Sequence, residues 1–149
     1  MPWGRRITGI TARELGMLTE AQVVLLACQV ARWLRPRGKL IEWSGRAVAR
    51  VPAGLDAAGA STVSLVCWSV TRAARYGVFR PQCLVRALAL QRMLRRRGIM
   101  ESSLHIGVRR QDGVFQAHAW VELNGAVLGD TRQHVRTFTR VSDLRLVEL

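Results

Sequence analysis

The strongest constraint on the fold is an alternation of polar and apolar residues that two glycine turns divide into three segments. The segments are 104–110, 114–123 and 126–130, and alternation of this kind predicts strands. Asp112-Gly113 and Asn124-Gly125 separate them, and Asp-Gly and Asn-Gly are typical of short hairpin loops. We therefore expect a small antiparallel sheet in this part of the chain.

A helix with a cysteine at its start is predicted directly before this sheet. Pro81 suits the first helical position, where its missing N–H costs no hydrogen bond, and Gly98 is expected to cap the other end. One stripe at helical spacing faces the core: Cys83, Ala87, Leu90 and Leu94. The helix dipole and the free N–H groups of the first turn favour the thiolate of Cys83, although many free cysteines are simply small buried side chains.

A histidine and an aspartate on the predicted strands complete a possible catalytic triad with this cysteine. His118 lies on the second strand and Asp130 at the end of the third. In such triads the histidine takes the thiol proton, and the aspartate orients and stabilises the imidazolium. A two-residue loop at Asn124-Gly125 would pair Ala119 with Asp130, so the carboxylate would point away from His118. A three-residue loop ending at Gly125 would place Asp130 opposite His118. We expect this loop, or a bulge with the same effect, and a hydrogen bond between the two side chains.

Several segments together resemble the transglutaminase-like cysteine peptidases of lasso peptide biosynthesis, the separate protease half of the split B protein. These segments are Cys83–Leu90, the Leu-Arg-Arg-Arg-Gly run ending at Gly98, His105–Val108, Ala117–Glu122 and Gly129-Asp130. The resemblance covers roughly residues 61–138. It implies an α+β, papain/transglutaminase-like fold with helices packed on a small antiparallel sheet. It also implies leader removal from a precursor peptide, with Cys83 as nucleophile, His118 as base and Asp130 as orienting acid.

The same resemblance implies partners for the peptidase. These are the precursor peptide, a separate leader-binding protein that presents it, and a lactam synthetase that closes the freed core peptide. No cofactor is expected for the cleavage. Two alternatives stay open: a transglutaminase or amidase that uses the same triad, and a non-catalytic binding module with a basic surface.

Other polar residues near the predicted triad have less definite roles. The Gln82 side chain and the Cys83 backbone N–H are candidates for an oxyanion hole, although Gln82 equally suits a solvent-facing position. Trp120 shares a strand face with His118 and either shields the site from water or fills the core. A metal site built from Cys83, His118, Asp130 or His134 would lack the paired spacing that zinc sites usually show, so no metal is expected.

Length and composition set the broader context. The 149 residues predict one domain, 1–149, with an arm at 1–17, a helical part at 18–60 and a catalytic core at 61–149. Three cysteines are too few for a disulfide scaffold, and no signal peptide is evident. The apolar segment 21–31 is too short to span a bilayer. We therefore expect a cytoplasmic protein without a membrane partner. The net charge is +13, but the arginines are scattered and no nucleic-acid-binding motif stands out.

Two further helices are predicted before the cysteine helix. The first begins at Thr19, which forms a capping box with Gln22, and stops before Pro36. The second is Thr62–Arg75, capped by Ser61. A short helix is expected at 45–50. Cys28 and Cys67 lie on the apolar stripes of the two longer helices, and we interpret both as structural.

Overall fold

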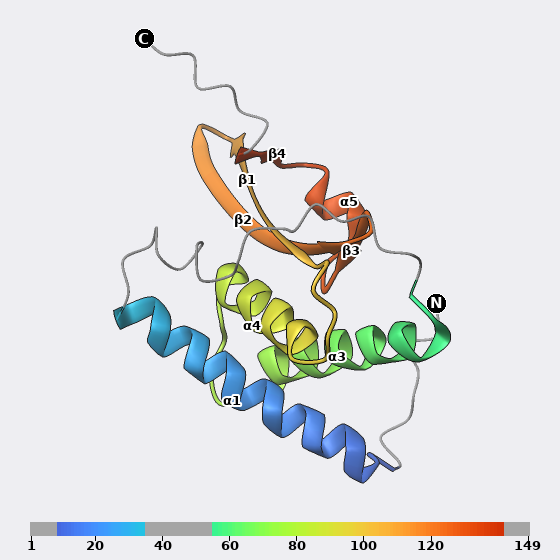
Figure 1. Cartoon of the computed structure of the whole chain (residues 1–149). Helices are drawn as coiled ribbons and strands as arrows, with labels where there is room; N and C mark the ends of the chain where they lie inside the picture. Colours follow the sequence, from blue (N-terminus) through green and yellow to red (C-terminus); the bar gives the residue numbers. More distant parts are fainter. Residues whose placement is uncertain (1–8, 35–54, 142–149) are drawn as a thin grey trace.

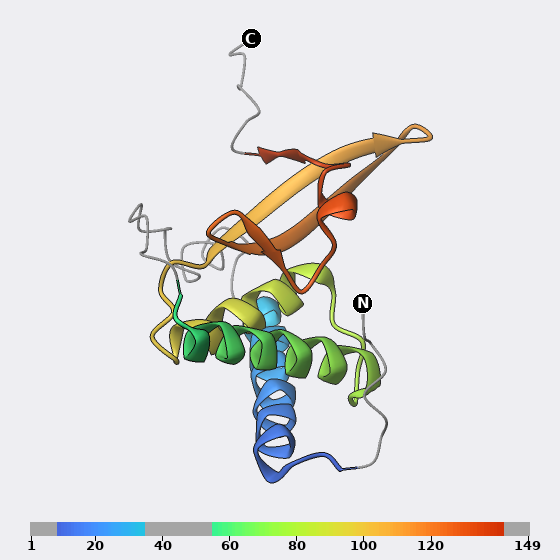
Figure 2. The ribbon, with the colours of Figure 1, turned by 90° about the vertical axis from the view of Figure 1, so that its right-hand side faces the viewer.

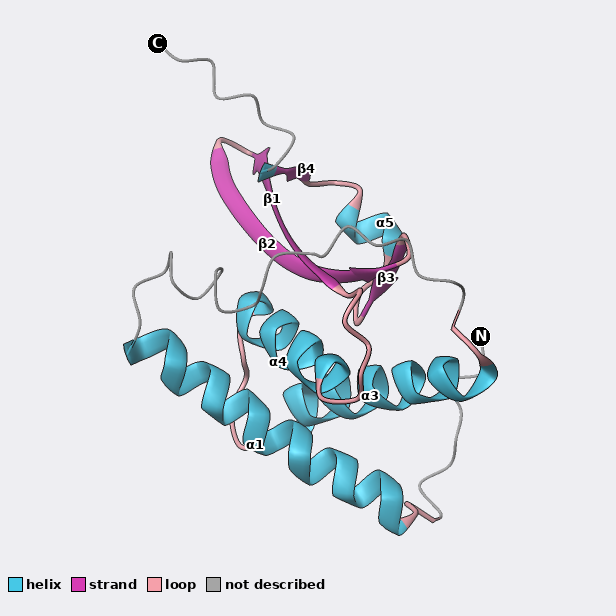
Figure 3. Cartoon of the chain, viewed as in Figure 1, coloured by secondary structure: helices cyan, strands magenta, loops and turns pink. Residues whose placement is uncertain are grey.

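The computed structural model describes residues 9–34 and 55–141, and it packs helices against a small sheet (Figure 1). The short helix expected at 45–50 lies outside the described residues. Figure 3 shows the three long helices gathered on one side and the strands, together with a short helix, on the other, which confirms the α+β class. The elements in chain order are α1 (Ala12–Leu34), α3 (Ala57–Tyr76), α4 (Cys83–Arg95), β1 (Ser103–Gln111), β2 (Val114–Leu123), β3 (Ala126–Leu128), α5 (Arg132–Val135) and β4 (Thr139–Arg140).

Helix α1 begins earlier than the sequence suggested, so the predicted start at Thr19 is wrong. The Thr11 hydroxyl accepts a hydrogen bond from the Glu14 N–H at 3.2 Å, and the Glu14 carboxylate accepts one from the Thr11 N–H at 2.8 Å. This reciprocal pair is a capping box in its own right. Thr19 lies inside the helix, where its hydroxyl donates to the Leu15 carbonyl. Residues 12–17, expected to be part of an irregular arm, are therefore helical.

The earlier start makes α1 longer than the apolar segment that the sequence suggested. By length and composition alone, its 23 residues could cross a membrane, a test that core helices and signal sequences also pass. One side of α1 packs into the protein core with the residues Met17, Ala21, Val24, Leu25 and Cys28. The burial of Cys28 agrees with its interpretation as a structural residue.

Helix α3 also begins before its predicted start. Asp56 is the N-cap, and its Oδ1 accepts a hydrogen bond from the Gly59 N–H at 2.7 Å. The prediction of Ser61 as the cap is wrong because Asp56 satisfies the free N–H groups one turn earlier. The apolar stripe that follows packs α3 against α1 and α4.

Helix α4 confirms one predicted end and corrects the other. Gln82 is the N-cap, so Pro81 lies just before the helix rather than at its first position. At the C-terminal end, Gly98 has a φ of +80°, and the N–H groups of Gly98 and Ile99 donate to the Arg95 and Leu94 carbonyls. This pattern of bonds is a Schellman motif, as expected for a C-terminal glycine.

The sheet has the strand order β3-β2-β1-β4, with every pairing antiparallel. The hairpin at Asp112-Gly113 is confirmed, since both residues have positive φ and Gln111 pairs with Val114. At the second turn Asn124 and Gly125 have φ of 51° and 77°, and Leu123 pairs with Ala126. The predicted three-residue loop is therefore wrong. Asn and Gly both accept the left-handed conformation that the shorter loop requires, and this loop matches the strand twist.

The two faces of β2 contribute to two different apolar clusters. Ala119, Val121 and Leu123 join the main core, which the three long helices share. Figure 2 shows these helices stacked below the sheet. Trp120 points the other way and packs with Val135 of α5 and with Phe138. This arrangement puts the first turn of α4 beside the middle of β2, where the predicted site residues lie.

Candidate active site

Cys83 is the first residue of α4 and lies on the helix face that meets the sheet. Ala87 and Leu90, on the same stripe, are buried, whereas Cys83 is half-buried. Cys83 lines a pocket of about 30 Å³ together with His118 and Asp130. The structure therefore brings all three predicted catalytic residues to one small pocket.

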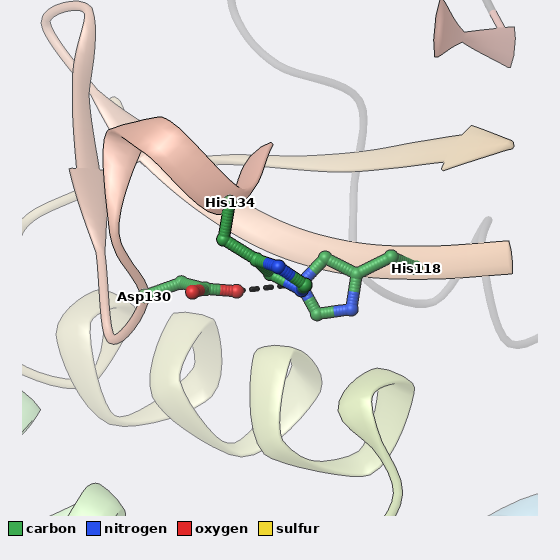
Figure 4. A group of neighbouring side chains, drawn as sticks. All are labelled: His118, Asp130 and His134. Atoms are coloured by element: carbon green, nitrogen blue, oxygen red, sulfur yellow. Dashed lines mark hydrogen bonds and ion pairs between the residues drawn. The ribbon is translucent and has the colours of Figure 1, made fainter. Parts of the chain in front are cut away.

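His118 and Asp130 form a direct hydrogen bond. The Nε2 atom of His118 lies 2.5 Å from Oδ2 of Asp130, and both side chains are largely shielded from solvent (Figure 4). An ionised carboxylate can only accept, so Nε2 carries the proton in this pair. The other ring nitrogen, Nδ1, is then free of its proton and can accept one from a neighbouring thiol.

Asp130 reaches His118 because the chain leaves the regular strand at Gly129. The register of β2 and β3 pairs Val121 with Leu128, and its continuation would place Asp130 opposite Ala119. Strand β3 ends at Leu128, however, and Gly129 has a φ of +71°. This left-handed residue redirects the chain, so the predicted contact forms although the predicted loop does not.

Two helices contact the Gly129 backbone that sets the direction of Asp130. The Arg86 guanidinium on α4 donates to the Gly129 carbonyl at 3.4 Å. Burial raises the pKa of the Cys67 thiol on α3 to about 11, and a hydrogen bond from the Gly129 backbone partly opposes this rise. A Cβ added at Gly129 would lie 3.2 Å from Leu90. Cys67 thus keeps a structural role, beneath the turn that holds Asp130.

Trp120 forms the floor beside His118. The two rings stack with centroids 6.1 Å apart, and His105 stacks on the indole with centroids 5.8 Å apart. The indole N–H donates to the buried Glu122 carboxylate at 2.9 Å, which fixes the orientation of the indole ring. Only 2% of Trp120 is exposed, so it fills the smaller core and packs against the His118 ring. His105 bonds to Ser103 and faces Glu122, away from the Cys83 pocket.

His134 is a neighbour of the site that the sequence indicated only as a possible metal ligand. It lies on α5, which Thr131 caps by accepting a hydrogen bond from the His134 N–H. The edge of the exposed His134 ring meets His118, with centroids 4.8 Å apart. His134 is exposed, as its polar segment predicts, but it also contacts the His118 ring. The signal in the sequence is weak, because only the turn at Gly129 brings α5 over the strand.

The predicted oxyanion residues occupy different positions. Gln82 is exposed, makes no side-chain capping bond, and lines a separate groove on the α1 side of α4 rather than the Cys83 pocket. Its carbonyl accepts from the Arg86 N–H, which is the first bond of the helix ladder. The N–H groups of residues 83–85 precede this ladder and have no acceptor within the helix. The Cys83 N–H thus stays available for an oxyanion.

Comparisons with known proteins agree with this arrangement. The family model described as the transglutaminase-like superfamily matches residues 24–143. The microcin J25-processing protein McjB of Escherichia coli is 43% identical over 53 residues, which are 36% of this chain and 24% of that protein. The match thus spans about a quarter of the length of this curated relative. No solved structure matches the chain significantly.

Proposed function

Because the chain belongs to the transglutaminase-like superfamily, we propose that it is a cysteine peptidase that removes the leader from a lasso peptide precursor. The observation that carries the proposal is the pocket that Cys83 shares with the hydrogen-bonded pair of His118 and Asp130. The similarity to a protein named for processing microcin J25 supports the substrate class. Cys83 is the proposed nucleophile, His118 the base and Asp130 the orienting acid.

The first step follows from the protonation of His118. With Nε2–H donating to Asp130, the free Nδ1 takes the proton of the Cys83 thiol, and Asp130 stabilises the imidazolium that forms. The thiolate sulfur then attacks the last carbonyl carbon of the leader. The carbon–nitrogen bond breaks as the imidazolium gives its proton to the leaving amine, which frees the core peptide and leaves a thioester on Cys83.

The helix end beside Cys83 is suited to hold the negative charge that develops in this step. Side chains cap the other helices of the described ranges, through Thr11, Asp56 and Thr131. The Gln82 side chain makes no such bond on α4. We propose that the Cys83 N–H stabilises the oxyanion, whereas Gln82, which lines a separate groove, is not part of this hole.

Hydrolysis of the thioester completes the cycle. His118 takes a proton from a water molecule, and the resulting hydroxide attacks the acyl carbon. The carbon–sulfur bond breaks, the sulfur leaves as a thiolate that is reprotonated through His118, and the leader departs with a free carboxylate. The chain needs no cofactor for these steps.

Substrate recognition is proposed to depend on a separate leader-binding protein. The Cys83 pocket is small, with a volume of about 30 Å³, and it is open to solvent. We propose that selection of the precursor uses surfaces outside the pocket or a second protein that raises the local substrate concentration. We further propose that a lactam synthetase takes up the freed core peptide, and that the protein acts in the cytoplasm, where Cys83 stays reduced.

An acyl transferase of the transglutaminase or amidase type is the second candidate, because its acyl-enzyme step needs the same residues. The two reactions differ only in the acceptor that resolves the thioester. Water gives a free leader carboxylate, whereas an amine gives an amide of different mass.

Mass spectrometry of a precursor peptide incubated with this protein tests the proposal. We expect a core peptide with a free amino terminus and a leader with a free carboxylate, formed faster when the leader-binding protein is present. The Cys83→Ala protein should give neither product while its circular dichroism spectrum stays that of the wild type. Cys28→Ala, which removes a buried thiol that does not line the pocket, is the matched control and should retain cleavage. Processing by Cys83→Ala would overturn the assignment.

A further inference from the structure

A third donor side chain lies beside the His118–Asp130 pair. His134 projects from α5 toward the pair (Figure 4), and one donor atom from each of the three residues lies within 4.8 Å of the others. We propose that His118, Asp130 and His134 form a binding site for a divalent transition-metal ion, represented by Zn²⁺, which blocks the catalytic base while it is bound. The blocking role rests on the proposed function, whereas the binding does not.

The three donor atoms would have to move only slightly to bind one ion together. Zinc bonds of about 2.0–2.2 Å to nitrogen and oxygen place tetrahedral ligand atoms about 3.3 Å apart. The donors of His118 and Asp130 are closer than this and share a proton, so the pair must open slightly. His134 is exposed and can move toward them without disturbing the core.

The donor set indicates the class of metal. Two imidazoles and one carboxylate favour zinc, cobalt or nickel over magnesium or calcium, which prefer oxygen ligands. Three protein ligands also leave a fourth position for water.

Neighbouring groups already orient two of the three ligands. The second oxygen of Asp130, Oδ1, accepts from the Thr131 N–H at 2.6 Å. The His118 ring stacks on Trp120 and lies 5.1 Å from the Phe138 ring centroid. Fixed ligands of this kind lose less freedom when an ion binds.

Occupation of the site would change the tautomer of His118. The ion takes the lone pair of Nε2, so the proton of the neutral ring must reside on Nδ1. A protonated Nδ1 cannot accept the Cys83 proton, and Asp130 is no longer free to orient the ring. The metal is therefore expected to inhibit the enzyme rather than to assist it.

The binding test uses Cys83→Ala, because a thiolate beside His118 could bind zinc by itself. Titration with Co²⁺ should give visible d–d absorption without the near-ultraviolet band of cobalt–thiolate bonds, and Zn²⁺ should displace the cobalt. Adding His134→Ala should weaken binding by at least about tenfold, since loss of even an outer-shell partner can cost that much. Adding His105→Ala, which removes a histidine outside the cluster, should not. Absence of binding, or equal affinity in the His134→Ala protein, would overturn the site.

The inhibition test uses the wild-type protein and the His134→Ala protein, both of which keep Cys83. For each protein it measures the ratio of the cleavage rates with and without Zn²⁺. The concentration for half inhibition should rise by at least about tenfold in His134→Ala. An equal value in both proteins would assign the inhibition to Cys83 and overturn the blocking role. The cobalt titration needs no substrate, so it can succeed even if the precursor is not cleaved, and this separates failure of the metal site from failure of the proposed function.

Discussion

The Asp130 carboxylate contacts the His118 ring at 2.5 Å although the β2–β3 register directs position 130 toward Ala119. The contact exists because Gly129, with a φ of +71°, turns the chain after only three residues of β3. Arg86 and the Cys67 sulfur hold the same glycine from two helices. The geometry of the proposed triad therefore depends on this turn more than on strand pairing.

The substitution Asp130→Asn tests whether the carboxylate orients His118. Asparagine has nearly the same shape, so we expect the fold to persist and the preferred His118 tautomer to be lost. By analogy with serine-protease triads, kcat for precursor cleavage should fall by about 100-fold or more. Steady-state kinetics and thermal unfolding of the same preparation measure both effects. Cleavage at the wild-type rate would leave Cys83 and His118 acting without an orienting acid.

The substitution Gly129→Ala tests the turn itself. An alanine in the left-handed region costs about 1–2 kcal/mol, and its Cβ would also press on Leu90 at 3.2 Å. We expect a loss of stability in urea together with a fall in kcat, because Asp130 moves.

The matched control for that substitution is Gly125→Ala. Gly125 has a φ of +77°, but an added Cβ would meet nothing within 4 Å, and the hairpin lies outside the Cys83 pocket. This variant should lose stability through the same backbone strain and keep its kcat. Equal losses of activity in both variants would show that general destabilisation, rather than the position of Asp130, lowers the rate.

Local sequence patterns were sufficient to predict much of the sheet and the end of α4 at Gly98. The strand at 114–123 and the Asp112-Gly113 turn are short-range features, and both formed as predicted. Burial does not alternate along β2, however, because its first four residues are exposed and its last five are buried. The helix starts were less predictable, because several residues compete as caps. Thr11 and Asp56 prevailed over Thr19 and Ser61, since each accepts a hydrogen bond from a backbone N–H three residues later and so starts the helix earlier.

The parts of the site that escaped prediction depend on tertiary structure. The position of Asp130 follows from one backbone angle at Gly129, which strand alternation cannot indicate. His134 approaches His118 only because the chain folds back over β2 after that turn. A sequence pattern can therefore propose the three triad residues, but it cannot supply the turn that joins two of them.

Selective alkylation tests the different environments of the cysteines. Burial raises the pKa of both Cys28 and Cys67 to about 11, so at pH 8 only about one in a thousand of either thiol is ionised. Cys83 is half-buried and lines an open pocket that a small reagent can enter. Iodoacetamide at pH 8 should therefore modify Cys83 first, as peptide mapping by mass spectrometry would show. Equal labelling of Cys28 or Cys67 in the folded protein would contradict these environments.

The ion pair between Glu20 and Arg97 predicts a pH-dependent contribution to stability. The Arg97 guanidinium contacts both carboxylate oxygens of Glu20, at 2.5 and 3.2 Å, and so joins α1 to the turn after α4. The hydrogen bond from Arg97 is the main cause that holds the pKa of Glu20 below its ordinary value of 4.5. The unfolded chain therefore binds a proton more readily than the folded one. The stabilisation is present above pH 4.5 and is lost as the pH falls through the lowered pKa.

Replacement of Glu20 by glutamine measures this contribution. At pH 7 the Glu20→Gln protein should have a free energy of unfolding lower by about 1 kcal/mol, because the pair is partly exposed and screened. The difference from the wild type should shrink as the pH is lowered below 4.5, because protonation then removes the same charge from the wild-type side chain. Urea unfolding at a series of pH values gives both quantities.

Glu101→Gln removes an equal charge from a residue that forms no ion pair within the described part of the chain, and it should leave the stability at pH 7 nearly unchanged. A difference for Glu20→Gln that stays constant into acid would show that packing, rather than the charge of the Glu20–Arg97 pair, stabilises this contact.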